Sequence, residues 1–97
     1  MEYIINPTNK KITLPKKGYY IKGDSGEDIE IISSFLACNF MGYESKLGVK
    51  IDDMLGEYFG DNLTACVKEF QRQNDMEADG GIGPKTLAKL REYGMDA

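Results

Sequence analysis

The stretch EFQRQNDMEADGGIGPKTLAKL, residues 69–90, decides the fold of this chain because it places a glycine-rich turn between two segments of helical periodicity. Apolar residues recur at three- and four-residue steps before and after the turn, at Leu63, Val67, Phe70, Leu87 and Leu90. Pro84 takes a favoured first-turn position in the second segment. The spacing predicts helices near 61–73 and 84–93.

A third helical pattern lies upstream, where the apolar positions are Ile29, Ile32, Leu36 and Phe40. Ser25, followed by Asp28 three residues later, offers a cap of the capping-box kind. Gly42 closes the pattern, which predicts a helix near 27–41.

The remaining segments carry weaker signals. Two short β-prone runs, Tyr3 to Ile5 and Lys11 to Leu14, flank a turn-rich segment and indicate a small hairpin or a pair of extended arms. Residues 43–59 read as a long connection with one short strand or helical turn. We therefore expect an N-terminal arm over 1–19 and an all-α three-helix domain over 20–97.

The last two helical segments resemble one unit used twice. A shift of 23 residues pairs Gly60 with Gly83, Val67 with Leu90, and Phe70 with Tyr93. The match indicates a duplicated turn-plus-helix element in which each glycine lets the chain turn sharply into its helix.

Composition and charge exclude several classes of protein. With 97 residues, 41% of them apolar and 29% charged, the chain can bury a core without a metal or a disulfide. Five lysines against one glutamate give residues 1–23 a net charge of +4, whereas the other residues carry seven basic and fifteen acidic side chains, a net charge of −8. An acidic body disfavours nucleic acid as the partner.

Catalysis, metal binding and cofactor binding are also disfavoured. The chain has no histidine, the common general base and zinc ligand. Its two cysteines lie in helical patterns, which favours buried thiols over a disulfide, and its adjacent carboxylates, as in Glu27 with Asp28, do not face each other across a cleft. We predict a non-enzymatic chain without a cofactor.

The turn begins like a calcium-binding loop but lacks the last ligand of such a loop. Asp75, Glu77 and Asp79 stand at alternate positions, as the ligands that open such a loop do, but the twelfth position holds Thr86 instead of a bidentate glutamate. Residues 80–86 also lack the spacing of a phosphate-binding loop. We expect no metal site.

The longest apolar run is too short to span a membrane, so no membrane partner is expected. The first residues, MEYIINPTNKK, lack the apolar core of a secretory signal. If the protein works outside a cell, either something else exports it or the chain is a fragment of a longer one.

Three segments together resemble the three-helix peptidoglycan-binding domain of phage endolysins and bacterial cell-wall hydrolases. The positions that match its pattern are Gly23, Gly26, Ile29, Ile32 and Leu36 in the first segment, Phe59, Gly60, Val67, Phe70 and Gln71 in the second, and Asp79, Gly80, Gly83, Thr86 and Leu90 in the third. The resemblance covers about Tyr20 to Tyr93. It departs from the pattern at Gly56-Glu57, Leu63 and Ser33, and in a longer connection before Gly60.

The resemblance implies a three-helix bundle and non-catalytic binding of peptidoglycan, through its stem peptide or glycan, with a linked catalytic domain such as an amidase, muramidase or peptidase. It places the action at the bacterial cell wall, and the missing signal fits a phage lysin held in the host cytoplasm before release. The residues expected to contact the ligand flank the two turn-into-helix junctions and are Tyr58, Gln71, Arg72, Asp79, Gly80 and Thr86.

Two alternatives remain at this level. Asp79, Gly80, Gly83 and Thr86 fit the demands of local geometry alone, because an Asp-Gly turn and a Gly-Pro helix start need such residues. The fold could also serve a phage or bacterial adaptor or structural protein that binds a protein partner.

Overall fold

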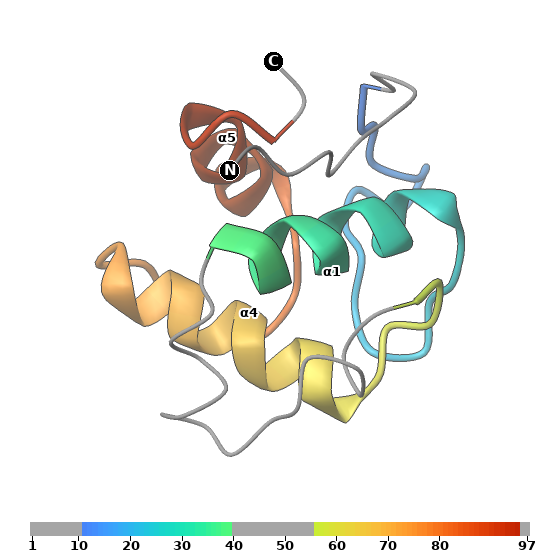
Figure 1. Ribbon diagram of the computed structural model, residues 1–97, viewed down its shortest axis with the longest axis horizontal. Coiled ribbons are helices and arrows are strands. Elements are labelled where there is room, and N and C mark those ends of the chain that lie inside the picture. The colour runs from blue at the N-terminus through green and yellow to red at the C-terminus, as the bar shows by residue number, and fades with distance from the viewer. Residues whose placement is uncertain (1–10, 40–55, 96–97) are drawn as a thin grey trace.

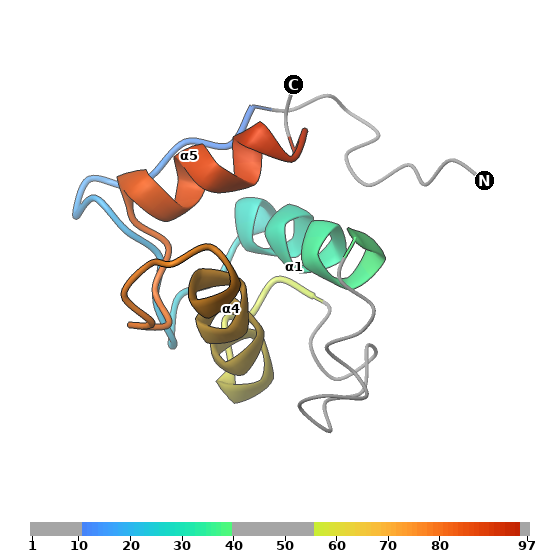
Figure 2. The same cartoon turned by 90° about the vertical axis from the view of Figure 1, so that its left-hand side faces the viewer.

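The computed structural model describes residues 11–39 and 56–95, and these residues form three α-helices. The helices are α1 (Glu27–Asn39), α4 (Asp61–Gln73) and α5 (Pro84–Glu92). Figures 1 and 2 show α5 above α1 and α4 below it. The predicted all-α three-helix fold is confirmed, although positions 40–42, where the first helix was predicted to end, lie outside the described residues.

One apolar core joins the three helices. The fully buried side chains at its centre come from every helix and from the segments that enter α4 and α5, and they include Ile29, Ile32, Leu36, Phe59, Leu63, Val67, Phe70, Ile82 and Leu90. The rings of Phe70 and Tyr93 meet edge to face, with centroids 5.7 Å apart. These two residues occupy equivalent positions in the duplicated units, so the units contact each other through a matched aromatic pair.

The duplicated element is present in the backbone. Gly60 and Gly83 precede α4 and α5 with nearly the same dihedral angles, φ −105° and ψ −166° against φ −97° and ψ −169°. Both lie in the extended region that any residue adopts, so neither entry needs the conformational freedom of glycine. The sequence-based explanation for these two glycines is therefore wrong, whereas the repeat itself is observed.

One non-helical segment before α1, residues 20–26, ties the two units together. Tyr20 exchanges two backbone hydrogen bonds with Ile82, at 3.0 and 2.7 Å, and Ser25 forms an antiparallel bridge with Tyr58. Gly26 directly precedes α1 and its carbonyl accepts the amide of Glu30 at 3.3 Å. The predicted Ser25 cap is therefore wrong, because Ser25 lies one residue too early and belongs to the bridge.

The described part of the N-terminal arm is anchored rather than strand-paired. Residues 11–15 form neither helix nor strand, so the strand expected over Lys11–Leu14 is not formed. Ile12 is instead fully buried in the core, and its carbonyl accepts a hydrogen bond from the Arg91 guanidinium on α5. Residues 3–9 of the expected hairpin, and residues 43–55 of the expected connection, lie outside the described residues.

Candidate functional site

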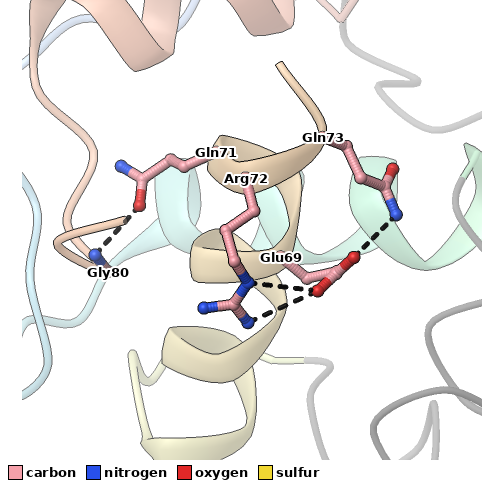
Figure 3. A network of polar contacts seen from close by, with 5 residues as sticks. All are labelled: Glu69, Gln71, Arg72, Gln73 and Gly80. Atoms are coloured by element: carbon pink, nitrogen blue, oxygen red, sulfur yellow. Dashed lines mark hydrogen bonds and ion pairs between the residues drawn. The ribbon is translucent and has the colours of Figure 1, made fainter. Parts of the chain in front are cut away.

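A buried glutamine on the last turn of α4 organises the turn that leads to α5. Gln71 is only 1% exposed. The two hydrogens of its Nε2 are shared among three acceptors, namely Asp79 Oδ1 (2.9 Å), the Gly81 carbonyl (3.0 Å) and Thr86 Oγ1 (3.1 Å). Its Oε1 accepts the Gly80 amide at 3.0 Å, as Figure 3 shows. One side chain thus fixes the turn and the first turn of α5 relative to α4.

The turn also has its own local constraints. Asp79 Oδ1 accepts the Gly81 amide at 2.9 Å, which closes an Asx turn. Gly80 has a φ of +80°, and a Cβ there would lie 2.9 Å from Thr64 Cγ2 on α4. Gly80 is therefore required both for its left-handed backbone and for its close approach to α4.

The end of α4 leads the chain into the same region through a Schellman motif. The Met76 amide reaches the Gln71 carbonyl at 2.9 Å, and the Asp75 amide reaches the Arg72 carbonyl at 3.2 Å. Asp75 takes the left-handed position with a φ of +57°, a conformation that favours glycine. The helix end therefore holds an acidic side chain at a strained backbone position beside the turn.

A cleft of about 560 Å³ opens between the end of α4, the turn and the start of α5. Its lining includes the acidic side chains of Asp75, Glu77 and Asp79, the base Lys85, and the apolar surfaces of Met76 and Pro84. The network around Gln71 contributes to its walls through Gln71 and Thr86, which are both buried. The cleft thus joins a rigid wall to exposed charges of both signs, which suits a polar, charged ligand.

Arg72 and Tyr58 lie apart from this lining. Figure 3 shows the Arg72 guanidinium reaching toward Glu69, whose carboxylate it contacts at 3.3 Å, while Gln71 points to Gly80. Glu69 is 3% exposed and also accepts from Gln73 Nε2 at 2.9 Å. Tyr58 is 60% exposed but precedes α4, which is about 20 Å long at 1.5 Å per residue.

Among the described residues, the titratable groups with the largest pKa shifts are Cys66 and Tyr20, and neither lines the cleft. Burial raises the pKa of the Cys66 thiol on α4 to about 11, which leaves it protonated and unreactive at neutral pH. Burial and the neighbouring carboxylate of Asp28 raise the pKa of Tyr20 to about 12. The Tyr20 hydroxyl lies 3.0 Å from Asp28 Oδ2 and 3.1 Å from the Thr13 carbonyl, so it joins the N-terminal segment to α1.

A family model described as "Putative peptidoglycan binding domain" matches residues 25–90. The chain belongs to this family. The domain is accordingly a non-catalytic binding module whose partner is peptidoglycan and whose place of action is the bacterial cell wall. Searches of curated proteins and of solved structures found no match to the chain.

The described part of the peptidoglycan-binding domain was compared with the requirements of a membrane-spanning helix and of a metal site. Among residues 11–39 and 56–95, no helix combines the length and the apolar character needed to cross a membrane. The same residues contain no group of three or more histidine, cysteine, aspartate or glutamate side chains placed to hold a metal ion.

The structure brings together four of the six predicted contact residues of the peptidoglycan-binding domain. Gln71, Asp79, Gly80 and Thr86 share one network, and three of them line the cleft. Tyr58 and Arg72 stand outside it. The six other lining residues were not among the predicted contacts and are Asp75, Met76, Glu77, Gly83, Pro84 and Lys85. The sequence pattern indicated Asp75 and Glu77 only as calcium ligands, although their position between a helix end and an Asp-Gly turn places them beside the same junction.

Proposed function

We propose that the domain binds peptidoglycan in the cleft between the end of α4 and the start of α5. The observation that carries this proposal is the cleft of about 560 Å³, one wall of which is held by the buried amide of Gln71. This amide makes hydrogen-bonding contacts with Asp79, Gly80, Gly81 and Thr86. A wall fixed in advance loses little conformational entropy when a ligand binds. The exposed charges beside it supply the polar contacts that a peptide ligand needs.

Within this proposal the six predicted contact residues take different parts. Asp79 and Thr86 line the cleft and contact the ligand directly, while Gln71 and Gly80 hold the wall in shape. Arg72 lies on the neighbouring face of α4. Tyr58 would meet only a ligand long enough to follow α4 to its other end, where an exposed aromatic ring offers a stacking surface for a sugar.

We further propose that this binding targets a linked or associated wall hydrolase, such as a phage endolysin or a bacterial autolysin, to its insoluble substrate. A tether raises the local concentration of cleavable bonds, so modest affinity of the domain is sufficient. The support for this proposal is membership of the peptidoglycan-binding family.

The direct test is co-sedimentation with purified sacculi, using a variant that fills the cleft. Gly83 lines the cleft, has an extended backbone and leaves open space where a Cβ would stand, so Gly83→Trp places a ring there without backbone strain. Gly83→Ala is the matched control, because it makes the same backbone change with a single methyl group. An unrelated acidic protein controls for charge.

We expect the native domain and Gly83→Ala to pellet with sacculi and Gly83→Trp to stay in the supernatant while keeping its native circular dichroism. If the native domain stays in the supernatant with several wall types, the protein is better explained as an adaptor for a protein partner. If Gly83→Trp pellets as well as the native domain, peptidoglycan binding stands and the cleft is the wrong site.

A further inference from the structure

The cleft carries charged groups that the protein itself does not pair. Asp75, Glu77 and Lys85 are exposed, and none of them forms an ion pair or a side-chain hydrogen bond with the residues that the structure describes. Other cations of the chain lie within 4 Å of an acidic partner, namely Lys17, Lys22, Arg72 and Lys89. The charges of the cleft are thus available to a ligand.

A buried hydroxyl in the cleft also has an unused donor. Thr86 is only 4% exposed, and its Oγ1 accepts a hydrogen bond from Gln71. Among the described residues, no acceptor is found for its hydroxyl hydrogen. Because Thr86 lines the cleft, its hydroxyl can donate a hydrogen bond to an acceptor atom of a bound ligand. Lys85 lines the same cleft, so both side chains are available to oxygen atoms of one ligand.

The lining of the cleft therefore suits two different groups of one ligand. The acids Asp75 and Glu77 suit a cation that donates hydrogen bonds, and Lys85 with Thr86 suits an anionic or carbonyl oxygen. Peptidoglycan stem peptides offer both groups where a diamino acid keeps a free side-chain amine, because that ammonium lies within a few bonds of a carbonyl or carboxylate. The glycan strand, in contrast, is rich in hydroxyl and acetamido groups that carry no positive charge.

We propose that the cleft selects stem-peptide segments that carry a free ammonium group, with Asp75 and Glu77 contacting the ammonium and Lys85 and Thr86 contacting the neighbouring oxygen. This inference rests on the proposed function. A cross-link converts the amine into an uncharged amide, so the domain favours regions of the wall with uncross-linked stem peptides. A hydrolase joined to such a domain would be held where the wall mesh is most open.

The test measures binding curves on two preparations of the same sacculi, one untreated and one treated with acetic anhydride so that its free amines become amides. The proteins are the native chain, the double variant Asp75→Asn/Glu77→Gln, and the control Glu30→Gln. Asparagine tolerates the left-handed position of residue 75, so the double variant keeps the fold. Glu30 is an exposed acid on the first turn of α1, outside the cleft lining, and its substitution removes one charge of the same kind.

We expect acetylation of the sacculi to raise the dissociation constant of the native chain and of Glu30→Gln at least about threefold, because each exposed charge contact contributes a fraction of a kilocalorie per mole to binding. The double variant should bind untreated sacculi as weakly as the native chain binds acetylated ones, and acetylation should no longer change its affinity.

Three outcomes would count against these ideas in different ways. Equal binding of the native chain to both preparations overturns the ammonium inference and leaves peptidoglycan binding intact. If acetylation of the sacculi weakens the binding of the double variant as much as it weakens the binding of the native chain, Asp75 and Glu77 do not contact the ammonium group. This result likewise overturns the inference. Failure of the native chain to bind untreated sacculi overturns the proposed function and the inference together.

Discussion

Replacing Gln71 tests whether one amide holds the cleft wall. In Gln71→Met the side chain keeps its length but loses all four hydrogen bonds, and the buried Gly80 amide loses its acceptor. A buried unsatisfied donor costs about 1–3 kcal/mol, and each net hydrogen bond contributes about 0.5–1.5 kcal/mol. Asp79 and Gly81 are accessible enough for water to replace part of the loss. We therefore expect a destabilisation of about 2–4 kcal/mol, a large share of the stability of a small domain.

Gln71→Glu is the more specific test because it keeps the shape of the side chain and replaces only the hydrogen-bond-donating NH2 group by an oxygen atom that accepts. A carboxylate still accepts the Gly80 amide, but it faces three oxygen atoms that Nε2 now bonds. We expect a destabilisation of about 3–5 kcal/mol at neutral pH, the cost of a buried charge without a compensating partner. Burial raises the pKa of such a carboxyl group, and protonation restores a donor, so the deficit relative to the native protein should shrink as the pH falls toward 5.

Urea unfolding followed by circular dichroism measures both effects, and Lys16→Met is the control. Lys16 is exposed, and its side chain forms no ion pair or hydrogen bond with the residues that the structure describes, so we expect its substitution to change stability by about 0.5 kcal/mol or less. Melting temperatures give a second reading, with a fall of at least about 8 °C for Gln71→Met in a domain of this size. If the unfolding free energies of Gln71→Met and Gln71→Glu both differ from that of the native protein by no more than about 0.5 kcal/mol, as expected for the control, the network around Gln71 does not hold the wall.

Three further predictions concern the framework. Asp75→Gly should stabilise the fold by about 0.5–1 kcal/mol in urea unfolding, because glycine adopts the φ of +57° without strain; a loss of stability would mean that the Asp75 side chain stabilises this helix end. Val67→Ala should cost about 2–4 kcal/mol in the same assay, since Val67 is 1% exposed in the core, and a cost below about 1 kcal/mol would show that the core relaxes around the smaller side chain. Folding raises the pKa of Tyr20 from 10.0 to about 12. The contribution of the Tyr20 hydroxyl to the free energy of unfolding is therefore complete below pH 10 and is lost as the pH rises toward 12. Unfolding free energies measured across that window should fall less steeply in Tyr20→Phe, and equal slopes would contradict the assignment.

The helices of this chain follow from its sequence because their signals are local and repeated. Leu63, Val67 and Phe70 recur at helical steps and are all buried on α4, as predicted. Of the two alternatives for the N-terminal segment, a hairpin or extended arms, the hairpin strand over Lys11–Leu14 is not formed. β-Propensity describes a fit to neighbouring strands, and here Ile12 is buried among helices instead. Ser25 failed as a cap for a related reason, since its pairing with Tyr58 depends on a residue far along the chain.

The candidate site was only partly accessible to sequence reasoning. The family resemblance selected Gln71, but a sequence pattern does not reveal that its amide is buried and bonded to four groups on the following turn. Asp75, Glu77 and Lys85 were missed as lining residues because side-chain direction at a helix end depends on the backbone there, and Asp75 takes a left-handed φ that its residue type does not announce. The ligand contacts themselves stay predictions for Tyr58, Gln71, Arg72, Asp79, Gly80 and Thr86.

The most direct test of the central claim is an NMR titration of the ¹⁵N-labelled domain with soluble muropeptides released from purified sacculi. If peptidoglycan occupies the cleft, the amide shifts should concentrate at Asp75, Met76, Glu77, Asp79, Lys85 and Thr86, whose residues line it. The amides of Ser25 and Tyr58, at the bridge before α4, should change little. Shifts gathered around Tyr58 and the start of α4, or an unchanged spectrum at millimolar muropeptide, would contradict the assignment of the cleft as the peptidoglycan site.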